Sequence, residues 1–341
     1  MKPHYTSLLS IIMIRCLPLF VACVLTLGIF TPMTIYADVI VKDSIPRRSK
    51  NLTTGFNQNW SYLPQLDNSV LIENINKLSP KMIRYPGGTV VHSWDWKKGA
   101  TSKIQLKDEI HPITDVKKLV DQTGVKMMIV LDVAYSTLTN QMQMLDSLHA
   151  LGVAIDYIEL GNELYSRDKK HNYPAIFPDG KAYVDTIAKW APKLKAAYPK
   201  AKIAALLLSR TSEFPKVASW NPLVTNAVNK AKVAIDAYTY HIYIFSGDNY
   251  GNRIADFNLA KVPTPGKEIW ITEYGNLNPS ADANYLTELN KLADYVEANF
   301  DITLSHAIIG NRPEHRGKLD TSTHGRTFTP EGKLFLKRVG H

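Results

Sequence analysis

Cysteine is nearly absent from this sequence. Two cysteines occur in 341 residues, Cys16 and Cys23, and both lie in the apolar stretch CLPLFVACVLTLGIF. Basic residues precede this stretch, and the segment TPMTIYAD follows it with the small residue Ala37 at the expected cleavage site. This pattern predicts a secretory signal peptide over residues 1–37; an uncleaved anchor is the alternative. Residues 38–341 then hold no thiol, which excludes disulfides and cysteine-bound metal from them.

Several catalytic motifs are also missing. The sequence has no G-x-S-x-G nucleophile elbow and no H-E-x-x-H zinc motif, and its ten histidines show no ligand spacing. No second apolar run is long enough to cross a bilayer. The 40 Lys and Arg outnumber the 31 Asp and Glu but are dispersed along the chain. We expect a monomer without metal, cofactor or nucleic-acid partner, and without membrane association once the signal peptide is cleaved.

The sequence does contain a regular alternation of two kinds of segment. Short, continuous apolar runs are typical of parallel strands that are covered on both faces. Such runs begin at Thr53, Lys81, Lys126, Ala154, Lys202, Ile235, Glu268 and Leu304. Eight strands with helices between them in roughly 300 residues predict an α/β fold, a single (β/α)8 TIM barrel over residues 38–341. A doubly wound open sheet is the alternative, but the first run lacks a glycine-rich phosphate turn.

Amphipathic segments with helix signals lie between the runs. Asp67 is the predicted cap of the first helix, and Thr329 is that of the last. In the segment that follows Asp179, apolar residues recur at three- and four-residue spacing. They are Tyr183, Ile187, Trp190 and Leu194. This spacing predicts a helix with one face packed against the barrel.

Polar residues stand at the ends of the predicted strands. Because the active site of a barrel lies at the carboxyl ends of its strands, these residues are the candidates for chemistry. They are Asn57, Arg84, Asp132, Asn162 with Glu163, His241 with Tyr243, Glu273 with Tyr274, and Asn311 with Arg312. Taken singly, Asp132 is interpreted as a helix cap, and Asn57 and Asn311 as loop anchors.

Glu163 and Glu273 are the most informative of these residues. Each ends an apolar run, in IELGNELY and WITEYG, and the fourth and seventh strands of a barrel face each other across its mouth. Two such carboxyl groups can divide the work of glycoside hydrolysis. One, kept protonated by apolar surroundings, donates its proton to the leaving group, while the other is ionised and attacks carbon. A separation of about 5 Å predicts retention through a covalent glycosyl-enzyme.

The combined pattern resembles the retaining (β/α)8-barrel glycoside hydrolases of clan A. In that clan an Asn-Glu pair ends strand four and a second Glu ends strand seven, as in LGNE and WITEYG here. The resemblance implies that Glu163 is the acid/base and Glu273 the nucleophile. The motif RYPGGT, which begins at Arg84, is most similar to the heparanase-like and β-glucuronidase-like branch. Arabinofuranosidase- and xylosidase-like branches come close behind. The similarity runs from Thr53 to Leu336.

The resemblance also implies supporting roles at the same site. Asn162 should donate to the sugar 2-hydroxyl, a hydrogen bond that strengthens as positive charge develops on the ring. Arg84 should keep Glu273 ionised and oriented, and Tyr243 should hydrogen-bond the same carboxylate. His241 should brace that corner of the site, with a satisfied core histidine as the alternative.

Aromatic residues near the strand tips are candidates for stacking on sugar rings, with ordinary loop packing as the alternative. They are Trp94, Trp96, Tyr165 and Tyr274. Two features depart from the family pattern. The eighth run, LSHAIIGNR, lacks the tryptophan that many clan members place under the sugar. No accessory β-sandwich is evident outside the barrel segment, so we expect the barrel without one.

The segment YSRDKKHNYP, which follows Glu163, concentrates positive charge in Arg167, Lys169, Lys170 and His171. Guanidinium and ammonium groups pair with carboxylate and sulfate, so this segment favours a uronic-acid-bearing or sulfated glycan; a solvated loop is the alternative. The sequence therefore predicts a secreted or periplasmic retaining glycosidase that acts on a poly- or oligosaccharide. A catalytically silent carbohydrate-binding barrel is the alternative, which the intact pair of glutamates disfavours.

Overall fold

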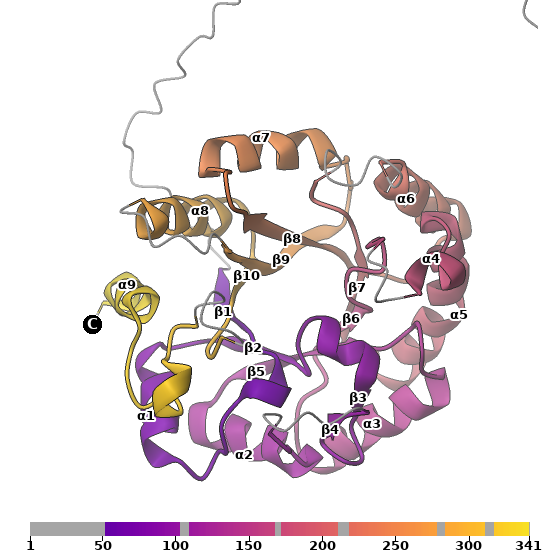
Figure 1. The fold of residues 1–341 in the computed structure, drawn as a ribbon. Coiled ribbons are helices and arrows are strands. Elements are labelled where there is room, and N and C mark those ends of the chain that lie inside the picture. The colour runs from indigo at the N-terminus through magenta and orange to yellow at the C-terminus, as the bar shows by residue number, and fades with distance from the viewer. Residues whose placement is uncertain are drawn as a thin grey trace, which may run out of the picture. The chain divides into compact units, whose positions relative to one another are not determined.

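A closed barrel of parallel strands organises the computed structural model (Figure 1). Its strands are β1 (Thr53–Asn57), β2 (Met82–Tyr85), β5 (Lys126–Leu131), β6 (Tyr157–Leu160), β7 (Lys202–Leu206), β8 (Ala237–Ile244), β9 (Glu268–Asn276) and β10 (Ile302–His306). Strand β1 closes the ring because it pairs with both β2 and β10. The predicted (β/α)8 barrel is confirmed, and the alternative of an open, doubly wound sheet is wrong.

The structure describes residues 52–102, 109–167, 172–210, 218–277, 284–310 and 317–340. All of them belong to the unit Ile45–His341. Several predictions fall outside the described residues: the signal peptide over residues 1–37, and the roles of Lys169, Lys170, His171, Asn311 and Arg312. Within the described part of the chain, no helix is both long enough and apolar enough to span a bilayer.

Helices surround the strands (Figure 1). They are α1 (Ser69–Lys77), α2 (Ile113–Thr123), α3 (Leu138–Ala150), α4 (Tyr173–Ile176), α5 (Gly180–Ala197), α6 (Trp220–Ala231), α7 (Tyr250–Ala260), α8 (Tyr285–Asn299) and α9 (Pro330–Val339). The 3-10 helices η1 (Trp60–Tyr62), η2 (Thr89–Ser93) and η4 (Thr321–Thr323) and the small hairpin of β3 (Trp94–Asp95) and β4 (Ala100–Thr101) complete the described elements.

Side-chain caps fix where several helices begin. Thr329 caps α9, as predicted, and Asp179 caps α5; each accepts a hydrogen bond from a backbone N–H in the first turn. At α1 the cap is Asn68 rather than Asp67. The predicted apolar stripe of α5 is buried, at Tyr183, Ile187, Trp190 and Leu194. Local sequence therefore sets these helix boundaries to within one residue.

The barrel interior is layered. Its lower layer is apolar and consists of Met82, Met128, Ala204, Ala237, Trp270, Ile302 and Leu304. Side chains in a strand alternate between faces, so Arg84 points to the same side of β2 as Met82, and Thr272 to the same side of β9 as Trp270. Together with Glu159 of β6, these polar side chains form a second layer that is fully buried. A charged layer thus lies between the apolar floor and the barrel mouth.

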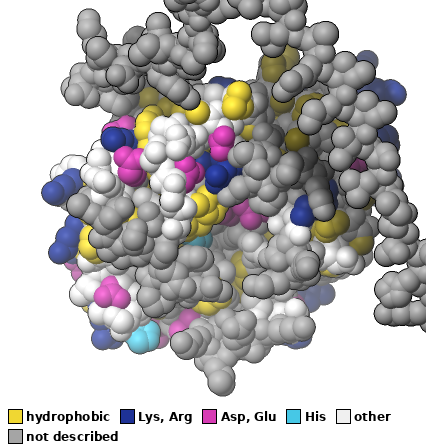
Figure 2. Space-filling model, turned by 45° about the horizontal axis from the view of Figure 1, so that its top comes forward, with side chains coloured by type: hydrophobic (Ala, Val, Ile, Leu, Met, Phe, Trp, Pro, Cys, Tyr) yellow, Lys and Arg dark blue, Asp and Glu magenta, His cyan; other side chains and the backbone are white. Residues whose placement is uncertain are grey.

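Charged side chains are interspersed on the surface. The face in Figure 2 shows Lys and Arg side chains beside Asp and Glu side chains. Many such pairs lie within one helix, such as Lys181 with Asp185 on α5 and Lys77 with Glu73 on α1, each 2.7 Å apart. Exposed pairs of this kind contribute little to stability. On the described part of this face the basic excess of the chain is therefore spread out rather than gathered.

Gly55 in β1 occupies a position at which the barrel has no room for a side chain. A Cβ there would lie 1.8 Å from the backbone carbonyl oxygen of Met82 on β2. We expect Gly55→Ala to lower the free energy of unfolding by about 2 kcal/mol or more, because β1 and β2 must move apart. Chemical denaturation measures the difference.

The control is Gly251→Ala on α7, where the nearest atom to the new Cβ would be Oδ1 of Asn249 at 3.3 Å. Alanine is the better helix former, so this variant should be as stable as the wild type or more so. A Gly55→Ala protein with wild-type stability would contradict the close pairing of β1 with β2.

Candidate active site

Glu273 faces the barrel mouth because β9 contains a bulge. The pairing of β9 with β8 skips Thr272, so β9 has one residue more than its neighbour at this point. A bulge shifts the alternation of side chains beyond it. Thr272 points into the barrel and donates to Oε1 of Glu159 at 2.9 Å, and the adjacent Glu273 also reaches the cavity at the mouth. Thr272 and Glu273, although consecutive, therefore both direct their side chains into the barrel.

Glu273 is held in its ionised form. Nη1 of Arg84 donates to its Oε1 at 2.5 Å, and the hydroxyl of Tyr243 donates to its Oε2 at 2.6 Å. Burial raises the pKa of Glu273, but the positive charges of His241, Arg84 and His306 and the hydrogen bond from Tyr243 outweigh burial and lower the pKa to about 2. Glu273 is therefore a carboxylate at neutral pH, and the predicted contacts of Arg84 and Tyr243 with it are present.

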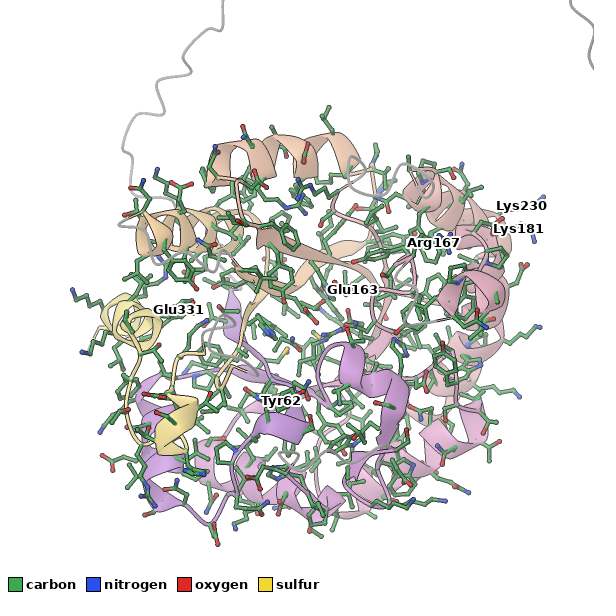
Figure 3. All side chains as sticks on the ribbon, in the orientation of Figure 1. Tyr62, Glu163, Arg167, Lys181, Lys230 and Glu331 are labelled. Carbon is green, nitrogen blue, oxygen red and sulfur yellow. The ribbon has the colours of Figure 1, made fainter. Side chains whose placement is uncertain are left out.

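Glu163 stands just beyond the end of β6, near the centre of the ring of strands (Figure 3). Its backbone φ is 45°, and that of Gly161 is 98°. Residues with side chains rarely adopt such left-handed conformations. The turn delivers the carboxyl group of Glu163 to the mouth, where its side chain is 33% exposed against 7% for Glu273. Of the two acids, Glu163 has the freer access to solvent.

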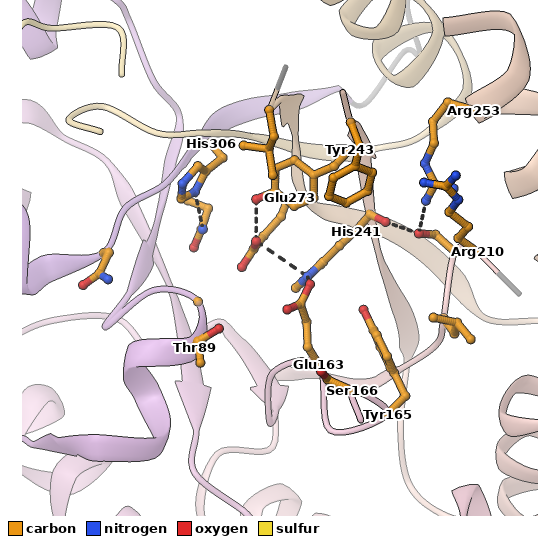
Figure 4. A pocket seen from close by; sticks show the side chains of 17 residues that line it. Thr89, Glu163, Tyr165, Ser166, Arg210, His241, Tyr243, Arg253, Glu273 and His306 are labelled. Carbon is orange, nitrogen blue, oxygen red and sulfur yellow. Dashed lines mark hydrogen bonds and ion pairs between the residues drawn. The ribbon is translucent and has the colours of Figure 1, made fainter. Parts of the chain in front are cut away.

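His241 lies between the two acids (Figure 4). Its Nδ1 is 2.9 Å from Oε1 of Glu163 and 3.6 Å from Oε2 of Glu273. One atom from each of these residues lies within 4.8 Å of the others. Burial lowers the pKa of His241, but the charge of Glu273 and the hydrogen bond and charge of Glu163 outweigh burial and raise it. The two predicted acids thus share one site, with an imidazole between them.

Arg84 connects the site to the barrel interior. Its side chain is fully buried, and it donates to Glu159 at 2.6 Å, Asn57 at 3.0 Å and Asn162 at 2.9 Å. Burial lowers the pKa of Arg84, but Glu159 and Glu273 outweigh burial and raise it. Because Oδ1 of Asn162 accepts from Arg84, the side-chain N–H groups of Asn162 remain for another partner.

A cavity of about 340 Å³ opens at this site (Figure 4). Glu163, Glu273, His241 and Tyr243 line it, together with residues that end or follow β1, β2, β7, β8 and β10. Its volume lies within the range of small-ligand sites, about 300–1,000 Å³. The carboxyl ends of the strands therefore enclose a space in which both acids are available to one ligand.

Tyr274 does not take the predicted position. The bulge at Thr272 turns Glu273 inward and therefore turns Tyr274 to the outer face of the sheet. Tyr274 is buried there beside Phe335 and Arg338 of α9. Its expected role as a sugar platform is wrong, because the alternation of the strand reverses at the bulge.

Trp94 and Trp96 also lie outside the cavity lining, whereas Tyr165 is part of it. The indole N–H of Trp94 donates to the hydroxyl of Tyr85 at 2.9 Å, and that of Trp96 donates to Oδ1 of Asn140 at 3.3 Å. Both indoles also pack partly against the hydrophobic core. The prediction that they face a sugar in this cavity is corrected, because their segment folds into β3 and packs beside the barrel.

The sequence did not predict His306 as a site residue, and it interpreted the candidate Asn57 as a loop anchor. Asn57 and His306 line the cavity, and Nδ2 of Asn57 lies 3.0 Å from Nδ1 of His306. Since Asn57 also binds Arg84, it belongs to the site rather than to a loop. His306 ends β10, whereas the sequence placed the tip of this strand at Asn311. The sequence signal that could have identified His306 is its position as a polar residue inside the apolar run LSHAIIG.

The donor set of the site suits hydrogen bonding better than metal binding. Two carboxylates and an imidazole are groups that a divalent cation could use. Both oxygens of Glu273 are already bonded, to Arg84 and Tyr243, and the guanidinium places a positive charge next to the site. The absence of a metal from the reaction stays a prediction.

Comparison with known families points to the chemistry. Residues 183–310 match the family model described as "Glycosyl hydrolase catalytic core", a segment that contains His241, Tyr243 and Glu273. The protein is a glycosidase. A comparison with curated proteins finds no match.

Solved structures of other glycosidases share the barrel. The GH51 α-L-arabinofuranosidase from Thermotoga petrophila RKU-1 is 17% identical with a TM-score of 0.62, over 88% of this chain and 70% of that one. The family 51 α-L-arabinofuranosidase from Bifidobacterium longum is 14% identical with a TM-score of 0.60, over 88% and 74%. The FMN-binding β-glucuronidase from Facaelibacterium prausnitzii L2-6 is 11% identical with a TM-score of 0.53, over 86% and 44%. At these identities the likeness establishes the fold of this glycosidase and not its substrate.

The hydroxyl of Tyr243 stabilises the ionised form of Glu273, so its removal should raise the pKa of Glu273. We expect Tyr243→Phe to move the acidic limb of the pH profile of kcat/KM upward by roughly one to two units. Hydrolysis of an aryl glycoside across the pH range measures the shift.

The matched control is Tyr240→Phe, on the same strand but facing α7, where it packs edge-on against Phe257. This variant should keep the wild-type profile. An acidic limb that does not move in Tyr243→Phe would show that the hydroxyl does not tune Glu273.

Proposed function

We propose that this glycosidase is a retaining enzyme in which Glu273 is the nucleophile and Glu163 the acid/base. The observation that carries the proposal is the separation of the two acids, since a carboxylate oxygen of one lies within 4.8 Å of one on the other. Retaining enzymes hold their carboxyl groups about 5–5.5 Å apart, whereas inverting enzymes need about 6.5–9.5 Å to admit a water molecule. The short separation does not admit a water molecule between the acid and the sugar, which favours direct attack by Glu273.

The first step forms a covalent intermediate. An oxygen of Glu273 bonds to the anomeric carbon while the glycosidic C–O bond breaks, and Glu163 transfers its proton to the departing oxygen. Glu273 is suited to attack because it is ionised at neutral pH. The amide of Asn162, oriented by Arg84, would donate to the sugar 2-hydroxyl as charge develops on the ring.

The second step releases the sugar. Glu163, now a carboxylate, takes a proton from a water molecule whose oxygen attacks the same carbon, and the bond to Glu273 breaks. Two inversions at one carbon give net retention. Glu163 suits this exchange because it is the more exposed of the two acids.

Chemical rescue tests the assignment of the nucleophile. Glu273→Ala should lower kcat by at least about 10⁴-fold, and azide should restore part of the rate by attacking in place of the carboxylate, giving a glycosyl azide of inverted configuration. Proton NMR of the first product of the wild type should show the retained anomer. An inverted product from the wild type would overturn the retaining mechanism.

Glu163→Ala provides the matched comparison for the acid/base. It should spare substrates whose leaving group hardly needs a proton, such as 2,4-dinitrophenyl glycosides, and should fail on alkyl glycosides. Azide should accelerate this variant as well but yield a product of retained configuration. Equal losses on both kinds of substrate would contradict the assignment of Glu163.

We also propose that the substrate is an acidic glycan, the class favoured by the basic segment that follows Glu163. Of the basic residues in that segment, Arg167 is described by the structure. Arg167 donates to the carbonyl oxygens of Phe177 and Pro178 and lies toward α4 and α5 (Figure 3). Arg210 and Arg253 instead line the cavity, on the side of His241 (Figure 4).

Among the described residues, the acids that pair with these two arginines are Asp248 and Asp256, and neither lines the cavity. Arg210 pairs with Asp256 at 3.1 Å and Asp248 at 3.7 Å, and its guanidinium lies 5.5 Å from the ring centroid of Phe245. The cations are thus the groups that a ligand meets. Two carboxylates at the mouth would repel an acidic sugar, and guanidinium groups in the same cavity would offset that repulsion.

Arg210→Met tests the acidic substrate. We expect KM for an aryl glucuronide or an aryl sulfated glycoside to rise roughly tenfold or more, with little change for the neutral glycoside of the same aglycone. Arg338→Met is the matched control, because Arg338 also pairs with two acids, Asp294 and Glu297, but lies away from this cavity. A wild type that hydrolyses only neutral glycosides would refute the acidic substrate and leave the retaining mechanism intact.

The proposed site of action follows from the predicted signal peptide over residues 1–37. We propose that the protein is exported, since an exported glycosidase meets polysaccharides outside the cell. This part of the proposal depends on the sequence alone.

A further inference from the structure

The turn that carries Glu163 has a demanding backbone. Gly161 and Glu163 both have positive φ, at 98° and 45°, on either side of Asn162. A φ of 98° strains any residue with a side chain, and a Cβ on Gly161 would also lie 2.7 Å from the side chain of Leu164, so this position favours glycine. A glutamate with positive φ is uncommon. Contacts from neighbouring elements must hold the peptide between Asn162 and Glu163 in this orientation.

One such contact comes from His92 in η2. Its Nε2 lies 2.9 Å from the backbone carbonyl oxygen of Asn162, and its Nδ1 lies 3.0 Å from Oδ1 of Asp132. A carbonyl oxygen can only accept, so Nε2 of His92 is the donor in this bond. The His92 side chain is 2% exposed and does not line the cavity. His92 therefore acts on the turn from behind the site.

Asp132 fixes the orientation of the imidazole. Its Oδ1 also accepts from the backbone N–H groups of Ala134 and Tyr135, each at 3.0 Å. The sequence predicted Asp132 as a helix cap, but Thr137 caps α3. Asp132 instead holds the loop after β5 and the ring of His92 together. Through Asp132 and His92, the loop after β5 is therefore hydrogen-bonded to the turn after β6.

The contact controls Glu163 through a shared peptide plane. The carbonyl group of Asn162 and the backbone nitrogen of Glu163 belong to one planar unit, so a hydrogen bond to that carbonyl fixes the plane from which Glu163 departs. Arg84 holds the side chain of the same Asn162 at 2.9 Å. With the main-chain carbonyl and the side chain of Asn162 both fixed, the carboxyl group of Glu163 is directed toward Nδ1 of His241.

We propose that His92, oriented by Asp132, is a positioning residue that holds the Asn162–Glu163 peptide and thereby aims the acid/base. The inference goes beyond the proposed function and rests on it for the role of Glu163. Its consequence is specific: loss of the contact should impair proton donation to the leaving group while leaving the attack of Glu273 intact.

The competing view is that His92 only fills space, since its ring packs against Tyr173 and Tyr135 with centroids 5.0 and 6.1 Å apart. The chain offers a matched control. Nδ1 of His111 lies 2.9 Å from Asp115, its Nε2 lies 2.6 Å from the backbone carbonyl of Leu63, and its side chain is fully buried. His111 has the same bonding pattern away from the cavity.

The test uses two substitutions that each keep one half of the histidine. The amide nitrogen of His92→Asn lies near the place of Nδ1 and can reach Asp132 but not the carbonyl of Asn162. That of His92→Gln lies near the place of Nε2 and can reach the carbonyl. We expect kcat/KM of His92→Asn on a phenyl glycoside to fall roughly 10- to 100-fold, and on a 2,4-dinitrophenyl glycoside by less than about threefold. His92→Gln should lie close to the wild type on both.

His111→Asn should lower the melting temperature about as much as His92→Asn but keep the wild-type dependence on the leaving group. The inference is overturned if His92→Asn also keeps that dependence, or if His111→Asn changes it in the same way. A crystal structure of His92→Asn gives a readout that needs no activity. A rotated Asn162–Glu163 peptide supports the inference, and an unmoved one overturns it, even if the wild type hydrolyses no glycoside and the proposed function fails.

Discussion

The barrel and its site depend on one buried cation, the guanidinium of Arg84. A buried charge is tolerated only when it is paired and hydrogen-bonded, and Glu159 and Glu273 supply the charge while Asn57 and Asn162 supply further acceptors. These partners come from β1, the end of β6, and β9, and Arg84 itself comes from β2. The orientation of Glu273 therefore cannot be separated from the closure of the barrel, because the same bonds secure both.

The two acids of the mouth acquire different characters from this one arrangement. Glu273 accepts hydrogen bonds from the guanidinium of Arg84 and the hydroxyl of Tyr243. These contacts and the nearby positive charges stabilise its carboxylate, and its pKa falls to about 2. Glu163 is more exposed, and its carboxyl group bonds to the imidazole of His241. Environment rather than residue type thus separates the two carboxyl groups, as division of labour between a nucleophile and an acid/base requires.

The strand tips could be predicted because apolar period and composition are local properties of the chain. Continuous runs indicate β6 and β9, and the polar residues that end them indicate Glu163 and Glu273. Tyr274 could not be placed in this way, because the bulge at Thr272 arises from pairing with the neighbouring strands and reverses the alternation of β9. His306 was not predicted as a strand tip because the apolar run continues past the end of β10. What the sequence does not encode locally is the register between strands, and the inward or outward orientation of a side chain depends on that register.

The two acids also differ in how they are held, and their chemistry explains the difference. A nucleophile stays ionised until it attacks, so it can be fixed through its own oxygens, as Glu273 is by two strong donors. An acid/base must give up a proton and take one back in each cycle, so donors that fix its charge would oppose one half of the reaction. Such a residue is better positioned through its main chain. The positive φ of Glu163, the glycine at position 161 and the bond from His92 to the Asn162 carbonyl position the carboxyl group through the main chain. That carboxyl group bonds to the imidazole of His241 rather than to the guanidinium and the hydroxyl that fix Glu273.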